Sequence, residues 1–385
     1  MSVGIRYGRS SLEIPALEIP VSIYTANRLP SVDPEQELAR ALRESVGTSE
    51  AGRFVSSAHR VAIVIPDPTR GMPKASMLRA LRRAIAHVPD EQLCVVVGYG
   101  KHAAMPDDRL GLPPEWAGRI RVEHHDATDS ARLRRVGTDE FGFHTNREVA
   151  EADAVIAIGA VRPHYFAGFT GGAKAILPGV AGAADITGNH ALRDRPGAWL
   201  GVADGNPARD HQEALVRLLK KVAVFNVVTN ADGSLVRAAF GDLVAVHRAL
   251  VPVARQIGEM PVKRHDLVIA GAGDPTAINI YQITKAVPPA ALCLAEGGTL
   301  IVCGPCKDGI GGAHAVNEII HRHTLTRFLP RAARCVLVSD LPRSEVEQTF
   351  FAHASDLGAA ITEAMRHRPA SAAILPDSVY LIPMP

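Results

Sequence analysis

The sequence predicts an α/β fold of two domains with largely parallel sheets, and three observations lead to this. Short apolar runs alternate with amphipathic stretches, a pattern typical of strands joined by helices. At 385 residues the chain exceeds what one hydrophobic core usually organises. The apolar pattern is interrupted near residues 258–265. We therefore expect domains of residues 1–260 and 261–385, with an active-site cleft between them.

The expected strands are short apolar runs, each followed by a loop. They lie at 61–65, 93–97, 154–158, 222–228, 267–270, 299–303 and 335–338. Residues 76–87 place apolar side chains on one face at helical spacing. Asn206 and Pro207 make a cap and first turn for a helix expected to run to Lys220.

Composition excludes several classes of protein. The formal net charge is only +2, and neither sign forms a long run. This charge pattern argues against binding to nucleic acid or to an anionic membrane. Its first residues carry charges and no continuous apolar stretch, which is unlike a signal peptide or a membrane span. We expect a cytoplasmic protein.

The five cysteines are odd in number and scattered, which argues against a disulfide framework. Cys303 and Cys306 form the one CxxC motif. A redox or metal role is open to this pair, but the pattern favours structural thiols at a strand end.

The segment from His164 to His190 is the most informative in the chain. It sets one lysine and two histidines among Gly, Ala, Thr and apolar residues. Gly171 and Gly172 lie just before Lys174 in the sequence, and their conformational freedom permits backbone amides to face an anion. A Gly-rich turn with a solvated Lys174 is the structural alternative.

Other polar residues follow the expected strands. Asp67 and Arg70 come after the first run, His102 after the second, His164 after the third, and the segment 281–285 after the fifth. Ligands gather at the carboxyl ends of strands in such sheets. We therefore expect these side chains to share a site.

The segment 164–190 closely resembles the lactate racemase family, the nickel-pincer enzymes. Its spacing of His, Lys and His matches the family residues that act as a catalytic acid/base, as the covalent anchor of the cofactor and as a nickel ligand. By this resemblance His164 is catalytic, Lys174 carries the cofactor and His190 binds nickel. His102, in GYGKH, corresponds to the other catalytic histidine.

Two further motifs extend the resemblance over residues 60–310. Asp67, Thr69 and Arg70 in PDPTR match an early family loop, and Tyr281, Gln282 and Lys285 in YQITK match its substrate-facing segment. Two departures concern the choice of substrate. Pro68 stands where the family usually has His, and Ala103 stands where Arg is common.

The resemblance implies a cofactor, pyridinium-3-thioamide-5-thiocarboxylic acid mononucleotide carrying nickel. The residues expected to hold it besides Lys174 and His190 are Asp67, Thr69, Thr170, Gly171 and Gly172. Enzymes that synthesise the cofactor would then be partners of this chain, with no nucleic acid and no membrane involved.

The implied function is an isomerase that racemises a short-chain aliphatic 2-hydroxyacid by reversible hydride transfer to the cofactor. His102 and His164 would serve opposite faces of the substrate, since an imidazole pKa of about 6.5 makes both protonation states available. Arg70 and Lys285 would hold its carboxylate, with Tyr281 and Gln282 beside it. An apolar lining is expected from Ala103, Met105, Phe169 and Ile310.

Three alternatives remain open at this point. A malate racemase or sugar-acid epimerase would use the same machinery on another substrate. An enzyme forming a Schiff base on Lys174 would also use a Gly-rich phosphate loop. A non-catalytic carrier of the nickel cofactor would keep Lys174 and His190, yet would have no reason to keep His102 and Lys285.

Overall fold

The computed structural model describes residues 3–102 and 104–385, and the chain divides into two compact units. One unit is Leu29–Gln256, and the other joins residues up to Arg28 with Ile257–Pro385. Ala103, expected in the apolar lining, lies outside the described residues.

The boundary near residue 260 agrees with this division, whereas the first 28 residues do not follow the expected domain of residues 1–260. Strand β1 (Val3–Gly8) pairs in parallel with β15 (His265–Gly273) of the C-terminal segment and antiparallel with β2 (Ser10–Ile14). Ile5 and Ile14 are buried in the core beside β15. These apolar contacts and ladder hydrogen bonds attach the N-terminus to the C-terminal unit.

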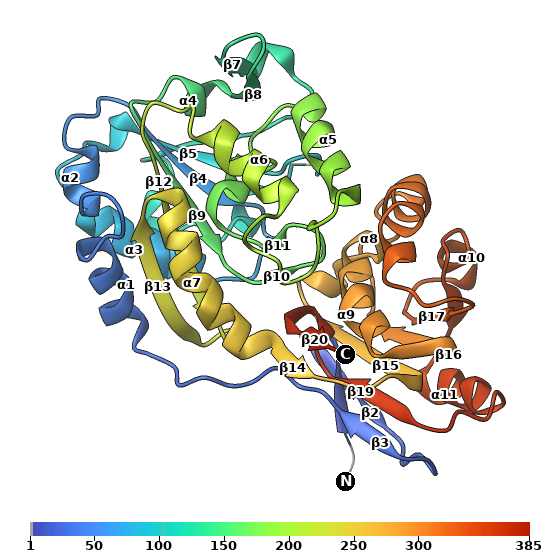
Figure 1. The fold of residues 1–385 in the computed structure, drawn as a ribbon. Coiled ribbons are helices and arrows are strands. Elements are labelled where there is room, and N and C mark those ends of the chain that lie inside the picture. The colour runs from blue at the N-terminus through green and yellow to red at the C-terminus, as the bar shows by residue number, and fades with distance from the viewer. Residues whose placement is uncertain (1–2, 103) are drawn as a thin grey trace. The chain divides into compact units, whose positions relative to one another are not determined.

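The unit Leu29–Gln256 is an α/β layer structure (Figure 1). Its strands are β4 (Val61–Pro66), β5 (Leu93–Gly98), β6 (Arg121–His124), β7 (Leu133–Gly137), β8 (Gly142–Asn146), β9 (Ala154–Ala160), β10 (Pro163–His164), β11 (Gly168–Phe169), β12 (Val222–Thr229) and β13 (Leu235–Gly241). Its helices are α1 (Pro34–Arg43), α2 (Ala51–Val55), α3 (Lys74–Ala84), α4 (Arg147–Ala150), α5 (Ala183–Ala191), α6 (Pro207–Val216) and α7 (Leu243–Gly258).

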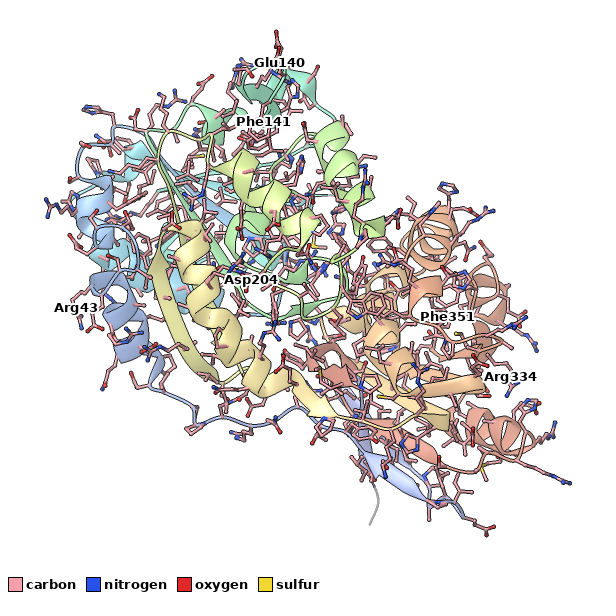
Figure 2. The ribbon with its side chains drawn as sticks, in the orientation of Figure 1. Arg43, Glu140, Phe141, Asp204, Arg334 and Phe351 are labelled. Atoms are coloured by element: carbon pink, nitrogen blue, oxygen red, sulfur yellow. The ribbon has the colours of Figure 1, made fainter. Side chains whose placement is uncertain are left out.

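The main sheet of this unit has the order β13-β12-β9-β4-β5-β6, parallel except for β13. Helices α1, α2 and α3 bury apolar residues against one face, and Figure 1 shows α6 and α7 in front of the sheet. Arg43 and Glu140, at the ends of α1 and of the β7–β8 hairpin, point outward into solvent (Figure 2).

The second unit is built on a mixed sheet around β15. Besides β1 and β2, its strands are β3 (Val21–Ile23), β14 (Glu259–Pro261), β15 (His265–Gly273), β16 (Leu294–Cys303), β17 (Arg334–Val338), β18 (Ala352–Ala354), β19 (Ala372–Leu375) and β20 (Ile382–Met384). Its helices are α8 (Ile280–Ile283), α9 (Val287–Leu292), α10 (Arg343–Val346) and α11 (Leu357–Met365), with a π-helix at Ala315–Arg322.

Alternate residues of β15 face opposite layers in this unit. Val268 packs in the layer with α8 and α9, whereas Leu267 and Ile269 pack in the layer with α11. The strands β18-β17-β16-β15 are parallel neighbours. Both faces are therefore covered, as the continuous apolar run at 267–270 indicates.

Every strand expected from the sequence is present, and the α/β class with largely parallel sheets is confirmed. Asn206 caps α6 through its side chain and Pro207 is the first residue of the helix, but α6 ends at Val216, before Lys220. All five cysteines are free, and burial raises the pKa of the Cys303 and Cys306 thiols to about 12. Across the described residues, every helix is too short or too polar to span a bilayer.

Candidate active site

Three adjacent strands bring the expected polar residues to one edge of the sheet in the unit Leu29–Gln256. β9, β4 and β5 are parallel neighbours, so their carboxyl ends meet at the same edge. Asp67 follows β4, His102 follows β5, and His164 follows β9. The rule that ligands gather at this edge therefore applies to all three.

His102 is oriented by a carboxylate. Its Nδ1 lies 3.0 Å from Oδ2 of Asp67, whose side chain is only 3% exposed. A carboxylate can only accept here, so Nδ1–H donates and the neutral ring presents an unprotonated Nε2. The cofactor role expected for Asp67 stays a prediction, and in this structure its Oδ2 accepts from His102.

Neighbouring groups keep Asp67 ionised. Burial alone would raise the pKa of this carboxyl, but the hydrogen bond from His102, the charge of Arg70 and the bond from the Thr69 hydroxyl outweigh it, so the pKa lies below its ordinary value. The Thr69 amide also donates to Oδ1, at 2.7 Å. Thr69 thus supports Asp67.

Lys74 also lies beside this group and was missed by sequence reasoning. Its Nζ is buried and donates to the carbonyls of Pro66, at 2.7 Å, and Leu110, at 2.9 Å. Burial lowers the pKa of the Lys74 ammonium to about 8, against the charge of Asp67. These bonds fix the end of β4 just before Asp67.

His164 has different surroundings. It lies in β10, which pairs with β11, and its Nδ1 accepts from the backbone amide of Ala167 at 3.2 Å. An amide only donates, so the neutral ring carries its proton on Nε2. Tyr165 stacks on the ring at 4.7 Å between centroids, and Phe166 meets its edge at the same distance.

Phe166 connects the three residues of the informative segment. Its ring, 3% exposed, contacts His164, lies edge-on to His190 at 5.3 Å between centroids and lies 5.7 Å from Nζ of Lys174. His164, Lys174 and His190 therefore surround one aromatic side chain. Its position between two reactive histidines was not evident from the sequence, where an aromatic residue in this run fits a core position equally well.

Lys174 lies in a short 3₁₀ helix, Gly172–Ala175, and is half-buried rather than fully solvated. Burial lowers the pKa of its ammonium from the ordinary 10.5 to about 7, and the charges of Arg70 and Arg209 act in the same direction. Near neutral pH a large fraction of this amine is therefore unprotonated and nucleophilic.

His190 occupies the last turn of α5. Its Nε2 is buried and has no hydrogen-bond partner among the described residues. Burial, followed by the charges of Lys174, Arg193, Lys101 and His102, lowers the pKa of this imidazole to about 3. A neutral nitrogen with a free lone pair is the form of histidine that binds a metal ion.

The glycine-rich loop is a structural element in this fold. Gly171 has φ +79°, and a Cβ there would lie 2.8 Å from Oδ1 of Asn226. That oxygen accepts from the amide of Gly172 at 2.7 Å, and the amide of Thr170 donates to the carbonyl of Arg162 at 2.8 Å. The expected use of the Thr170, Gly171 and Gly172 amides for a phosphate is not supported, because two of the three already donate within the chain.

The remaining expected residues belong to the other unit. Tyr281 and Gln282 lie in α8, and Lys285 lies one turn further along the chain. Nζ of Lys285 donates to Oε1 of Gln282, which confirms that the two residues share a face. Ile310 packs beside Tyr281, whereas Phe169 of the first unit is fully buried and lines no open space.

Comparisons with known proteins find relatives over most of the chain. The lactate racemase N-terminal domain model matches residues 7–200, and the C-terminal domain model matches residues 260–334. The lactate racemase of Lactiplantibacillus plantarum is 27% identical over 325 residues, covering 82% of this chain and 77% of its own length. That of Thermoanaerobacterium thermosaccharolyticum is 25% identical over 421 residues and covers 99% of both chains.

Two solved structures share the fold. The lactate racemase apoprotein from T. thermosaccharolyticum superposes with a TM-score of 0.86 at 24% identity, over 100% of both chains. A protein from Thermotoga maritima gives a TM-score of 0.68 at 16% identity, over 92% of this chain and 100% of its own.

The fold and the curated relatives together define an enzyme of the racemase class. The chain belongs to the lactate racemase family. It is accordingly an isomerase of the racemase class.

Proposed function

We propose that this protein racemises a short-chain aliphatic 2-hydroxyacid such as lactate. The observation that carries the proposal is the pair His102 and His164 near a desolvated Lys174, on one edge of one sheet. The two curated relatives are both lactate racemases. Arg70 and Lys285 are the cations that we assign to the substrate, and they suffice for one carboxylate, which favours lactate over malate.

The residues present fit the nickel-pincer nucleotide that the resemblance implies. An attachment point needs an unprotonated amine, and burial supplies one at Lys174. A nickel ligand needs a free imidazole lone pair, and Nε2 of His190 is buried without a partner. An anionic nucleotide needs positive surroundings, which Arg70, Arg193 and Lys101 provide around these two residues.

Lys174 would hold this group as a covalent adduct, and the imidazole of His190 would supply a nitrogen ligand to its nickel. When bound, it would supply an electron-poor acceptor for the hydride of the substrate C2, a function that no protein side chain supplies.

The chain's own residues would handle the proton and the carboxylate. His102 would take the hydroxyl proton through Nε2, because Asp67 accepts from its Nδ1–H and orients the ring. His164 presents Nε2–H and so donates a hydrogen bond to the substrate oxygen. Arg70 is a fork for the carboxylate, and we propose the same substrate-facing role for Tyr281, Gln282 and Lys285.

A panel of single enantiomers followed by chiral chromatography tests the reaction. Lactate and its short homologues should be converted faster than malate or sugar acids, and a clear preference for malate would overturn the choice of substrate. Substrate deuterated at C2 should keep its label in the inverted product. Extensive washout into solvent would contradict hydride transfer and favour proton abstraction.

Mass mapping and metal analysis test the cofactor. Protein made beside the cofactor-synthesis enzymes should carry a covalent nucleotide on Lys174. His190→Ala should lower nickel content while the adduct remains. Fully active protein with an unmodified Lys174 would falsify the assignment.

A further inference from the structure

The loop between His164 and Lys174 has an unusual hydrogen-bonding pattern. Each backbone carbonyl from Phe166 to Gly171 accepts a hydrogen bond from a residue outside the loop. The donors are Asn206 to Phe166, Arg209 to Ala167, Phe169 and Gly171, Gly201 to Gly168, and His247 to Thr170. Residues 166–169 and 171 are buried, so their carbonyls need donors within the protein. Side chains and backbone from other segments supply them all.

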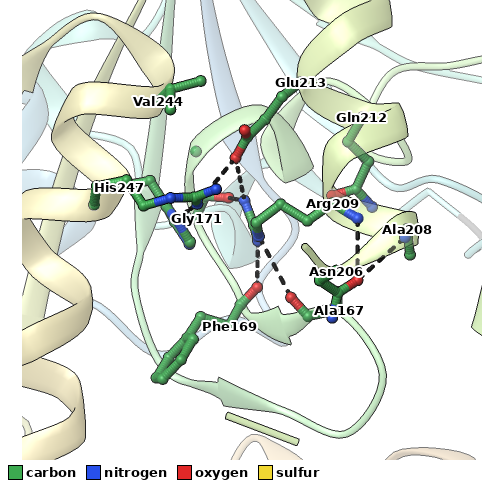
Figure 3. Close-up of polar contacts among 12 residues, drawn as sticks. Ala167, Phe169, Gly171, Asn206, Ala208, Arg209, Gln212, Glu213, Val244 and His247 are labelled. Carbon is green, nitrogen blue, oxygen red and sulfur yellow. Dashed lines mark hydrogen bonds and ion pairs between the residues drawn. The ribbon is translucent and has the colours of Figure 1, made fainter. Parts of the chain in front are cut away.

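Arg209 makes half of these bonds from α6 (Figure 3). Its Nε and Nη1 lie 3.4 Å from the carbonyl oxygens of Ala167 and Gly171, and Nη2 donates to Phe169. The side chain is 0% exposed. Its position in the first turn of a helix is also unfavourable for a cation, because the helix dipole is positive there.

The counter-charge of Arg209 is weak and shared. Oε1 of Glu213 lies 3.6 Å from Nη1 of Arg209 and 3.3 Å from Nη1 of Arg248, which also pairs with Asp204 at 2.6 Å. A buried charge is costly unless it is well paired and hydrogen-bonded. The ion pair does not account for this arginine, whereas three loop carbonyls match its planar fork.

We propose that Arg209 is a positioning residue, which fixes the loop joining the acid/base His164 to the cofactor lysine Lys174 so that the two keep one relative placement. The inference rests on the proposed function for the roles of His164 and Lys174. In this proposal Arg209 acts through the loop carbonyls that it binds and not through the substrate or the cofactor. His247, whose Nε2–H donates to the Thr170 carbonyl at 3.1 Å, assists it with a single bond.

Two variants and one control test the proposal. Arg209→Lys keeps the charge but replaces a three-donor fork by a point charge, so it cannot hold three carbonyls at once. His247→Ala removes only one bond to the loop and is the milder change. Arg217→Met removes a surface arginine just after α6 that pairs with Asp242 at 3.3 Å and contacts none of these carbonyls.

Hydrogen–deuterium exchange on protein without cofactor gives the first readout. In Arg209→Lys, amides of residues 166–172 should exchange about tenfold faster or more, while β4 and β5 keep their protection. His247→Ala should show a smaller change at the same residues. Arg217→Met should match the wild type.

Steady-state kinetics of the loaded enzyme give the second readout. Arg209→Lys should lower kcat roughly tenfold or more with KM little changed, because misplaced reacting groups slow chemistry more than binding. If Arg209→Lys does not fold, the His247→Ala variant tests the proposal instead. For this variant we expect accelerated exchange at residues 166–172 and a smaller loss of kcat.

Wild-type exchange at residues 166–172 in a folded variant would overturn the proposal, as would an equal loss of protection throughout the sheet. The exchange experiment does not depend on the substrate. An enzyme inactive on every 2-hydroxyacid would therefore contradict the proposed function. The exchange experiment would still decide whether Arg209 holds the loop.

Discussion

The surroundings of His102 and His164 differ in a way that their shared residue type hides. An ionised, buried carboxylate holds Nδ1–H of His102. A backbone amide donates to Nδ1 of His164, and two aromatic rings pack around it. The neutral rings therefore differ in hydrogen-bonding character at Nε2. Nε2 of His102 is an unprotonated acceptor, and Nε2–H of His164 is a donor.

This difference has a consequence for a reaction that runs both ways. Asp67 is compatible with both neutral and protonated His102, because Nδ1–H donates to it in either state. His164 keeps its bond from Ala167 only while Nδ1 is unprotonated. Acting as a base through Nε2 requires the Nδ1–H tautomer, which loses that bond. In this structure His102 can accept a proton at Nε2 and keep its bond to Asp67, whereas His164 cannot do so and keep its bond from Ala167.

Replacement of either histidine should have the largest effect. Because each turnover uses one ring as base and the other as acid, His102→Ala and His164→Ala should each lower conversion in both directions by roughly 10²- to 10⁴-fold. Chiral chromatography from each pure enantiomer measures this. If one variant lost conversion in a single direction only, the two-histidine scheme would be wrong.

Asp67→Asn should have the next largest effect, and this effect should be confined to His102. An amide group turned to donate would favour the other tautomer of His102, and kcat should fall on the order of 10²-fold. ¹⁵N NMR of the imidazoles should show the change at His102 while the His164 signals keep the Nε2–H pattern. Unchanged tautomers at His102 would show that Asp67 does not orient it.

Phe166→Leu should alter the surroundings of His164 and should cause a smaller loss of kcat. The smaller side chain leaves space beside His164, His190 and Lys174, so we expect a roughly tenfold loss of kcat with Asp67 and His102 unaffected. Phe54→Leu is the matched control, since Phe54 lies edge-on to Phe240 in the core of the same unit. If both variants lowered kcat equally, general loosening rather than placement would be the cause.

The pH dependence of stability should show the smallest effect. The folded protein holds the Asp67 carboxyl at a pKa below its ordinary value, so the unfolded chain binds the proton more readily. This contribution to the free energy of unfolding is fully present above about pH 4 and is lost as pH falls toward the folded-state pKa. Urea unfolding between pH 3 and 6 should therefore show a shallower decline for Asp67→Asn than for the wild type. An identical decline would mean that the pair adds nothing to stability.

The sequence by itself determined the α/β class, the strands and the edge at which Asp67, His102 and His164 meet. Apolar runs and helical periodicity are local signals, and the carboxyl-edge rule converts strand ends into a common location. The spacing of His164, Lys174 and His190 likewise indicated the family, which the domain matches then showed.

Only the tertiary structure decided which partner each polar group takes. His102 meets Asp67 across 35 residues of sequence, and Arg209 reaches the loop across about 40, distances over which no local pattern specifies a hydrogen bond. The same holds for the N-terminal strands, because pairing of β1 with β15 depends on the folded sheet edge. Sequence chemistry set which groups are present, and long-range packing set their tautomers, pKa values and partners.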